Sequence, residues 1–314
     1  MQTKANDILR EVKKVVIGKD EKIARVLMAI LAGGHVLIED VPGVGKTTLA
    51  LAFSKALGLD YNRTQFTPDV VASDIVGFSM YDKERGDFTF REGSVFCNLF
   101  LADEINRTSS KTQSALLEVM EEGQVTVDGQ TYVLPKPFTV IATQNPAGSA
   151  GTQLLPNAQL DRFLIRLTMG YPDFDSQIEI LRDRQTGNPI DNVENAVSAE
   201  DLLSMQQQAS KVHTADEILA YITRLAEASR SHPMVTLGIS PRGAIAVLRM
   251  AKACAFVEGR DYVLPKDVQD VFLDVCAHRI LLGSRAKVSE KGAEDVLREI
   301  LEKEEVESGL WEKR

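Results

Sequence analysis

The chain has 314 residues, of which 44% are hydrophobic and 26% charged, and its formal net charge is −9. This composition is typical of a soluble globular protein, and the length suggests two domains or one large one. The acidic balance argues against nucleic acid as the main partner, because nucleic-acid binding depends on basic side chains that neutralise phosphates.

The three cysteines, Cys97, Cys254 and Cys276, lie far apart and form no CxxC pair. We therefore expect neither a disulfide framework nor a zinc site, and such cysteine usage fits a reducing cytoplasm. The N-terminal segment has no long apolar run, and no segment reaches about 18 uninterrupted apolar residues. We expect a cytoplasmic protein with no signal peptide and no membrane insertion.

Short apolar runs alternate with helical patterns in the first half of the chain. The runs at 35–39, 99–104 and 138–143 predict buried strands, and the patterns at 5–16, 20–32, 46–57 and 109–122 predict helices. Alternation of this kind predicts an α/β fold, with a mostly parallel sheet covered by helices on both faces.

Two polar segments interrupt this rhythm and are predicted to be hairpin insertions. Residues 78–92 have a polar tip, and residues 124–137 alternate around Asp128-Gly129. The Asp-Gly pair is a strong short-range hairpin signal. We expect both hairpins to project from the α/β core, where they are either solvent-exposed or face a partner.

Beyond residues 171–175 we expect no further strands. Helices are predicted at 174–186, 199–211, 215–231, 241–257, 265–280 and 289–306. The chain therefore divides into an α/β domain at 1–172 and a smaller all-helical domain at 173–314, with a hinge at Pro172-Asp173. We expect the charged C-terminal tail to be a frayed helix end, with Trp311 covering the adjacent surface.

A phosphate-binding loop is predicted in "EDVPGVGKTT", between the strand at 35–39 and the helix at 46–57. The usual pattern is Gly, four residues, Gly, Lys and then Ser or Thr, and Asp40 stands where the first Gly is expected. Backbone N–H groups and the helix dipole hold the phosphate. The backbone can close on it only where side chains are absent, as at Gly43 and Gly45.

The remaining loop residues suit nucleotide chemistry. Lys46 can reach the terminal phosphates as a point charge, and the Thr47 hydroxyl suits a Mg²⁺ ligand. Pro42 fixes φ at the turn. The alternative is a chance Gly/Pro turn, since GxGK[S/T] arises by luck in roughly one chain of this length per hundred. The strand-loop-helix context favours the functional interpretation, with Asp40 as a turn cap where the loop begins.

An acidic pair, Asp103-Glu104, ends the predicted strand at 99–104. Asp103 can hold Mg²⁺ through water, and Glu104 can orient and deprotonate an attacking water. A solvated strand end is the alternative. The phosphate loop upstream favours metal-assisted phosphate chemistry.

These motifs together resemble the AAA+ ATPases, and within their helix-2-insert branch the MoxR family. The resemblance runs from about residue 16 to 167 and more loosely to about 300. It rests on "HVLIEDVPGVGKTTLA", "FTPDVVASDIVG", "LFLADEINRTSSKTQSALLEVMEEGQVTV", "VIATQNP", "LLPNAQLDRF" and "SPRG". Members of this family also lack the first Gly of the phosphate loop, so Asp40 fits the resemblance.

The resemblance implies a role for each matching residue. ATP phosphates would be bound by Gly43, Val44, Gly45, Lys46, Thr47 and Thr48, while Val16, Ile17 and Gly18 would flank adenine. Asp103 and Glu104 would form the Walker B pair, and Asn145 would be the sensor-1 residue.

Two arginines also receive roles from the resemblance. Arg162 is similar to the arginine finger that reaches a neighbouring subunit's ATP, with Arg166 as an alternative for this task. Arg242 is similar to sensor 2, in the first turn of a helix capped by Ser240, where it would touch ATP and couple the lid to hydrolysis.

The implied function is ATP-driven, chaperone-like remodelling or maturation by a ring, with a hexamer expected. The implied partners carry a von Willebrand factor A domain with a metal-dependent adhesion site. A nucleic-acid motor or loader, a P-loop kinase and a magnesium-chelatase-like motor subunit remain alternatives.

The sequence departs from the family pattern at three places. Residues Ala147, Gly148, Ser149 and Ala150 form a stretch of small side chains, Asn157 stands where an acid is common, and "VVASD" lacks a proline. We expect ATP chemistry to survive these changes and subunit contacts or partner choice to differ.

Overall fold

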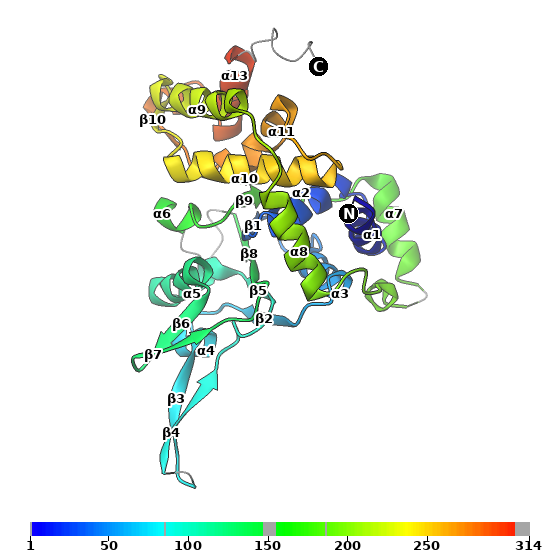
Figure 1. Ribbon diagram of the computed structural model, residues 1–314, viewed down its shortest axis with the longest axis vertical. Helices are drawn as coiled ribbons and strands as arrows, with labels where there is room; N and C mark the ends of the chain where they lie inside the picture. Colours follow the sequence, from blue (N-terminus) through cyan, green and yellow to red (C-terminus); the bar gives the residue numbers. More distant parts are fainter. Residues whose placement is uncertain (1, 85, 147–154, 186, 305–314) are drawn as a thin grey trace.

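A central parallel sheet organises the computed structural model, which describes residues 2–84, 86–146, 155–185 and 187–304 (Figure 1). Five strands pair in the order β2-β5-β8-β1-β9. They are β1 (Val36–Glu39), β2 (Tyr61–Gln65), β5 (Leu99–Asp103), β8 (Thr139–Gln144) and β9 (Ile165–Leu167), and all four pairings are parallel. The predicted α/β fold class is confirmed.

The strands β2 and β9 are absent from the sequence prediction. β2 reads "YNRTQ" at the sheet edge and is only partly buried, and β9 has just three residues. A polar edge strand and a very short strand carry little hydrophobic periodicity.

Helices cover both faces of the sheet, and each face has its own hydrophobic cluster. Strand residues Leu99 and Leu101 face α1 (Gln2–Lys13), α2 (Asp20–Leu31) and α3 (Lys46–Ala56). Alternate residues such as Phe100 and Ala102 face α4 (Ala72–Val76) and α5 (Ser110–Glu122). This division follows from the two-residue period of a strand buried on both faces.

Both predicted hairpins are present. The first pairs β3 (Gly77–Asp82) with β4 (Asp87–Glu92), and the second pairs β6 (Gln124–Val127) with β7 (Gln130–Val133). Asp128 and Gly129 both have positive φ, 50° and 78°, as the tight two-residue turn requires.

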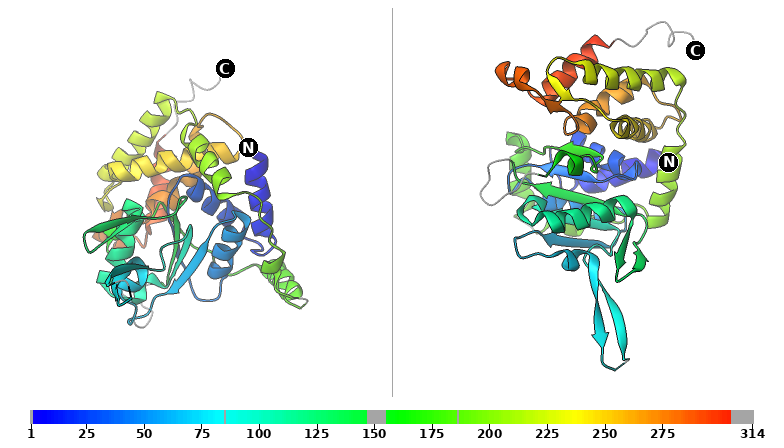
Figure 2. Two further views of the ribbon diagram at one scale, coloured as in Figure 1. Left: turned by 60° about the horizontal axis from the view of Figure 1, so that its bottom comes forward. Right: turned by 90° about the vertical axis from the view of Figure 1, so that its left-hand side faces the viewer.

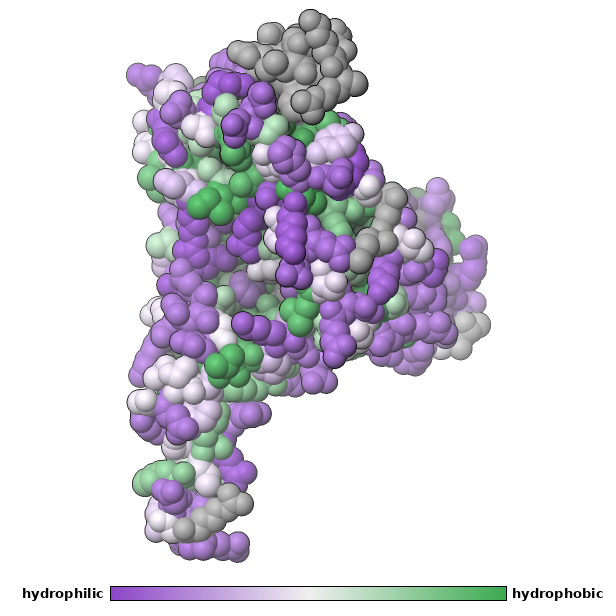
Figure 3. Space-filling model, in the orientation of Figure 1, coloured by the Kyte–Doolittle hydropathy of each residue, from purple (hydrophilic) through white to green (hydrophobic). Residues whose placement is uncertain are grey.

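The β3–β4 hairpin projects from the body of the molecule (Figures 1 and 2). Four of its large apolar side chains are at least 44% exposed: Phe78, Met80, Tyr81 and Phe88. Figure 3 shows hydrophobic and hydrophilic residues mixed along this projection. At its base, Phe90 stacks on Tyr132 of β7 with ring centroids 3.8 Å apart, so the two hairpins are joined.

The second half of the described chain is mainly helical. Its helices are α7 (Phe174–Asp183), α8 (Ala199–Ser210), α9 (Asp216–Ser231), α10 (Pro241–Val257), α11 (Pro265–Cys276), α12 (Ser284–Val288) and α13 (Ala293–Lys303). Short helical turns lie at η2 (Pro189–Asn192), at α6 (Asn157–Leu160) before β9, and at η1 (Ile105–Arg107) after β5.

The expectation that strands end before this half was wrong. A small antiparallel pair joins β10 (Val235–Leu237) to β11 (Leu281–Leu282). The last predicted helix, at 289–306, corresponds to α13, and the short helix α12 before it was not predicted. A turn at Glu290, whose φ of 53° is left-handed, separates the two helices. The segment from Glu305 onward, including Trp311, lies outside the described residues.

The helical part, called the lid from here on, packs on the α2 side of the sheet (Figure 2). α2 contacts α8 and α10, and a single hydrophobic cluster runs from α1 through α2 and α3 into the lid helices. Among the described helices, none is long and apolar enough to cross a membrane.

Candidate active site

The loop between β1 and α3 has the geometry of an anion-binding helix start. Gly43 and Gly45 have φ of 88° and 91°, and Gly45 is the N-cap of α3. A Cβ added at either glycine would meet no atom within 4 Å. The backbone therefore requires glycine for its conformation, and the space above the helix N-terminus is open to a phosphate.

Lys46 begins α3 and is 7% exposed. Its Nζ donates to the Asp40 carbonyl oxygen at 2.7 Å. Burial lowers the pKa of the Lys46 ammonium, and three nearby carboxylates, including that of Asp103, oppose this shift. The side chain is held in place at the loop by a weak acceptor, which a phosphate oxygen can replace.

Asp40 caps the turn at the start of the phosphate loop, as predicted. Its Oδ1 accepts from the Val41 N–H at 2.7 Å, and its Oδ2 accepts from the Gly170 N–H at 2.6 Å. The second bond was not predicted. It ties the start of the phosphate loop to the segment that leaves β9 for the lid.

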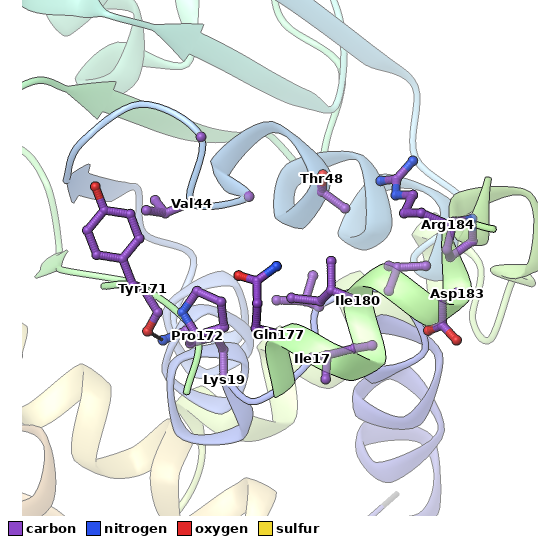
Figure 4. Close-up of a pocket in the computed structure, with 15 residues that line it drawn as sticks. Ile17, Lys19, Val44, Thr48, Tyr171, Pro172, Gln177, Ile180, Asp183 and Arg184 are labelled. Atoms are coloured by element: carbon purple, nitrogen blue, oxygen red, sulfur yellow. Dashed lines mark hydrogen bonds between the residues drawn. The ribbon is translucent and has the colours of Figure 1, made fainter. Parts of the chain in front are cut away.

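A cavity of about 340 Å³ lies beside the phosphate loop (Figure 4). Val16 and Ile17 line it together with Gly43, Val44, Gly45 and Thr48. The structure thus brings the segment expected to flank adenine to the phosphate loop.

Gly18 supports this arrangement from behind. Its φ is 70°, and a Cβ there would lie 2.1 Å from the Ser176 Oγ. A side chain at this position would push α7 away from the loop, so the glycine permits close packing between the predicted adenine segment and the lid.

The chain after β9 closes the cavity with residues that sequence reasoning missed. They are Tyr171, Pro172, Gln177, Ile180, Asp183, Arg184 and Pro189. In Figure 4, Gln177 and Ile180 point from α7 towards the phosphate loop, and Tyr171 lies beside Val44. In the sequence, only the helical pattern after the Pro172-Asp173 turn indicated that a helix follows β9, and nothing indicated that its residues line the cavity.

Asp103 ends β5 beside the neighbouring strands. Its Oδ1 accepts from the Thr143 hydroxyl at 2.6 Å, and its Oδ2 pairs with Arg63 at 2.6 Å. The fully buried Thr143 hydroxyl also accepts from the Glu104 N–H at 2.8 Å, so one residue of β8 orients both acids. Neither Arg63 nor Thr143 was predicted.

Glu104 is held in a backbone conformation that side chains rarely adopt. Its φ is 57°, and such left-handed non-glycine residues cost about 1–3 kcal/mol and cluster at functional sites. Its Oε2 pairs with Arg107 at 2.8 Å. This hydrogen bond lowers the pKa of the Glu104 carboxyl, so the group is ionised at neutral pH.

Asn145 follows β8 and reaches the same carboxylate. Its Nδ2 donates to Glu104 Oε1 at 3.3 Å, and its buried Oδ1 has no partner among the described residues. The fully buried Asn106 fixes the Asn145 backbone by donating to its carbonyl and accepting from its N–H. The unpaired amide oxygen keeps the capacity to accept one further hydrogen bond.

The two arginines with predicted roles lie together in a different cavity of about 300 Å³. Arg162 and Arg242 both line it, and both pair with Glu121 at 3.3 Å. Among the described residues, the two cavities have no lining residue in common.

This placement changes the expectation for Arg242. We expect it to touch ATP, and the structure places it beside the predicted finger, in a cavity apart from the phosphate loop of its own chain. The reason is the position of α10, which packs on α2 and places its first turn next to the loop before β9. Arg166, the alternative finger, pairs with Glu39 at 3.4 Å.

The comparisons with known proteins agree with this architecture. Residues 35–165 match the family model for ATPases associated with various cellular activities (AAA), and residues 227–300 match the AAA lid domain. A putative ATPase from Cytophaga hutchinsonii has a solved structure with a TM-score of 0.90 and 39% identity, covering 97% of this chain and 95% of that one.

Curated relatives refine the family. The chain is 46% identical to the uncharacterized protein YeaC of Bacillus subtilis, covering 93% of this chain and 92% of that protein. It is 39% identical to Chaperone MoxR1 of Mycobacterium tuberculosis, over 93% and 79% of the two chains. It is also 33% identical to Protein MoxR of Methylorubrum extorquens, over 87% and 86%. This chain belongs to the MoxR family of AAA ATPases.

The residues of this MoxR-family ATPase fit a magnesium ion at the terminal phosphates. Among the described residues, no group of three or more His, Cys, Asp or Glu side chains forms a complete metal cage. Mg²⁺ typically takes one or two protein oxygens together with phosphates and waters. Thr47 and Asp103 would hold it, and the ion would neutralise charge on the phosphates during transfer.

Asn157, one of the places where the sequence departs from the family pattern, lies within the part of the chain that the structure describes. Asn157 is the first residue of α6, directly before the segment that carries Arg162. The stretch from Ala147 to Ala150 lies outside the described residues.

Proposed function

We propose that this MoxR-family ATPase assembles with itself into a ring, with a hexamer expected, and hydrolyses Mg²⁺-ATP at sites completed by a neighbouring subunit. The observation that carries the proposal is the position of Arg162 and Arg242. Both lie in a cavity apart from their own phosphate loop, so they are available to the nucleotide of a second copy.

The proposal gives each site residue a task. The loop from Pro42 to Thr48 binds the phosphates, and Val16, Ile17 and Gly18 flank the adenine. Asp103 holds the metal ion, Glu104 accepts a proton from the attacking water, and Asn145 orients that water. Arg162 and Arg242 of the next subunit stabilise charge on the transferred phosphate.

Mixing two inactive variants tests the shared site. An Arg162→Ala variant should lose about 10³–10⁵ in turnover, as expected for an arginine finger. Mixing it with a Glu104→Gln variant should restore turnover, because the second protein supplies intact arginines to the intact ATP site of the first. Phosphate release at saturating ATP measures this. Mixtures that stay inactive would contradict a finger acting between subunits.

An apolar stripe on α7 supports assembly beside the nucleotide. Phe174, Ile178 and Leu181 share one face of the helix and are 80%, 39% and 59% exposed. Tyr171 extends this stripe and is 75% exposed. Other positions of α7, including Gln177 and Ile180, line the nucleotide cavity together with Tyr171, so a neighbour that reaches this cavity would also cover the stripe.

Replacing Phe174 and Leu181 together with Ser should weaken assembly. Each large apolar side chain contributes about 1.5–3 kcal/mol when fully buried, so the subunit concentration for half-maximal assembly should rise at least about tenfold. Sedimentation velocity across a dilution series measures the change. Leu219→Ser on α9, 39% exposed, is the matched control. Equal assembly by both variants would count against the stripe as an interface.

For the task of the machine, we propose chaperone-like remodelling or maturation of partner proteins, including proteins with von Willebrand factor A domains. The relative named Chaperone MoxR1 and the family resemblance support this class. The exposed apolar side chains of the β3–β4 hairpin offer a surface for such a partner. We also propose a cytoplasmic location, supported by the three free, buried cysteines.

We further propose that the nucleotide-binding domain ends at residue 172 and the lid begins at 173. The bond from Gly170 to Asp40 supports this division, because it fixes the chain to the phosphate loop just before the Pro172-Asp173 turn.

A further inference from the structure

One carboxylate joins the two arginines of the second cavity. Glu121 Oε2 lies 3.3 Å from Arg162 Nε, and Glu121 Oε1 lies 3.3 Å from Arg242 Nη1. Arg162 belongs to the loop before β9, whereas Arg242 belongs to the first turn of α10 in the lid. Glu121 therefore bridges a core arginine and a lid arginine through its two oxygens.

The position of Glu121 is unfavourable for the helix that carries it. It lies in the last turn of α5 next to Glu122, and that turn contains no basic residue. Negative charge at a helix C-terminus opposes the helix dipole. Helix stability does not explain an acid here, whereas the contact with the two arginines does.

The other acid that lines this cavity is Asp161, which pairs most closely with Arg279. Asp161 Oδ1 accepts from Arg279 Nε at 2.7 Å, and the Arg279 side chain is only 3% exposed. Arg279 also donates to the carbonyl oxygens of Phe163 and Leu164, at 2.7 and 3.1 Å. Asp161 and Arg279 thus fix the backbone of the finger loop. Asp161 Oδ2 also lies 3.9 Å from Arg242 Nε, a longer contact than the one from Glu121, and Glu121 is the acid that pairs with both guanidinium groups.

The charge balance gives Glu121 a second effect. Four arginines line the cavity, Arg162, Arg242, Arg249 and Arg279, against two acids, so the formal charge is 4 − 2 = +2. Without Glu121 it would be +3, and repulsion would drive the two exposed guanidinium groups apart.

We propose that Glu121 is a positioning residue that holds Arg162 and Arg242 in one shared orientation and releases them to a phosphate of the adjacent subunit. The inference rests on the proposed site between subunits. The Glu121 side chain is 40% exposed, and exposed ion pairs at this distance are weak. A phosphate in a closed interface forms stronger, charge-assisted hydrogen bonds, so the exchange favours the nucleotide.

Glu121→Gln tests the inference without disturbing the fold. Its kcat should fall roughly tenfold, because the donated arginines lose their alignment. Its own ATP affinity should be unchanged, since Glu121 does not line the nucleotide cavity. Thermal unfolding should change little, because the loss of two weak ion pairs is offset by removal of a charge that opposes the helix dipole. Glu122→Gln removes the same charge one residue along and should retain full turnover.

Mixing separates positioning in trans from a structural effect. Glu121→Gln mixed with Glu104→Gln should recover turnover, because the second protein donates correctly held arginines. In an Arg242→Ala background, Glu121→Gln should lower kcat less than it does in the unaltered protein, because half of the bridge is already lost.

Three results would overturn the inference. In the first, Glu121→Gln turns over like Glu122→Gln. In the second, its defect persists in mixtures in which Arg162→Ala is rescued, which places the effect within one subunit and leaves the proposed function intact. In the third, Arg162→Ala is not rescued either, and the proposed site between subunits fails together with the inference.

Discussion

Replacing Glu104 with Gln should abolish most ATP turnover and leave ATP binding intact. Glutamine keeps the size of the side chain, and its single amide oxygen can still accept a hydrogen bond from Arg107 or from Asn145, which donate to different oxygens of Glu104 at 2.8 and 3.3 Å. It cannot take a proton from water. Loss of a positioned general base typically lowers a rate by about 10²–10⁴.

Two measurements separate these effects. Phosphate release at saturating ATP reports turnover, and titration with a fluorescent ATP analogue reports binding. Glu118→Gln, an exposed position on α5, is the control for a general change in charge. Normal turnover by the Glu104→Gln protein would show that another group activates the water.

Replacing Lys46 with Ala should strongly weaken nucleotide binding itself. The ammonium is nearly buried and meets only a carbonyl acceptor at 2.7 Å, so its charge is available to a phosphate. A charge-assisted hydrogen bond is worth about 1.5–3 kcal/mol, which corresponds to roughly 10- to 100-fold in affinity. Calorimetric titration with ADP and with ATP measures the loss.

A conservative variant sharpens this test. Lys46→Arg keeps the charge but replaces a compact ammonium with a planar fork that needs more space. We expect it to bind nucleotide almost as poorly as Lys46→Ala, whereas the exposed Lys111→Ala should bind normally. Full binding by Lys46→Ala would mean that the backbone of the loop alone carries the affinity.

The parts of the site that could be predicted are those that follow one another along the chain. The phosphate loop combines a buried strand, two glycines and a helix start within a short segment, and each feature has a local signal. The pair Asp103-Glu104 is marked by the apolar run before it. Both hairpins were predicted because turn chemistry such as Asp128-Gly129 is also local.

The contacts that complete the site join residues about 40 positions apart. Thr143 orients Asp103 and Glu104, and Asn106 orients Asn145. Each of these polar residues reads as an ordinary strand or turn residue in the sequence. Their roles depend on β8 lying beside β5, which periodicity does not determine.

The location of Arg242 could not be predicted from the sequence for a similar reason, which here concerns the packing of whole helices. Its helix, its cap and its first-turn position all follow from "SPRG", and the Ser240 hydroxyl does accept from the Gly243 N–H at 3.1 Å. The direction in which this helix start points depends on how α10 packs on α2. That packing arises from apolar surfaces on both helices, and many orientations satisfy such surfaces equally well.

The division of the hydrophobic interior by the sheet has a consequence for how this molecule tolerates substitutions. One cluster contains the lid and the helices behind the phosphate loop, and the other contains α4, α5 and the bases of both hairpins. Because they share strands but not side chains, substitutions that reshape the hairpins are absorbed on one face of the sheet. Changes at the hairpins should therefore leave the packing between the lid and the phosphate loop unaltered.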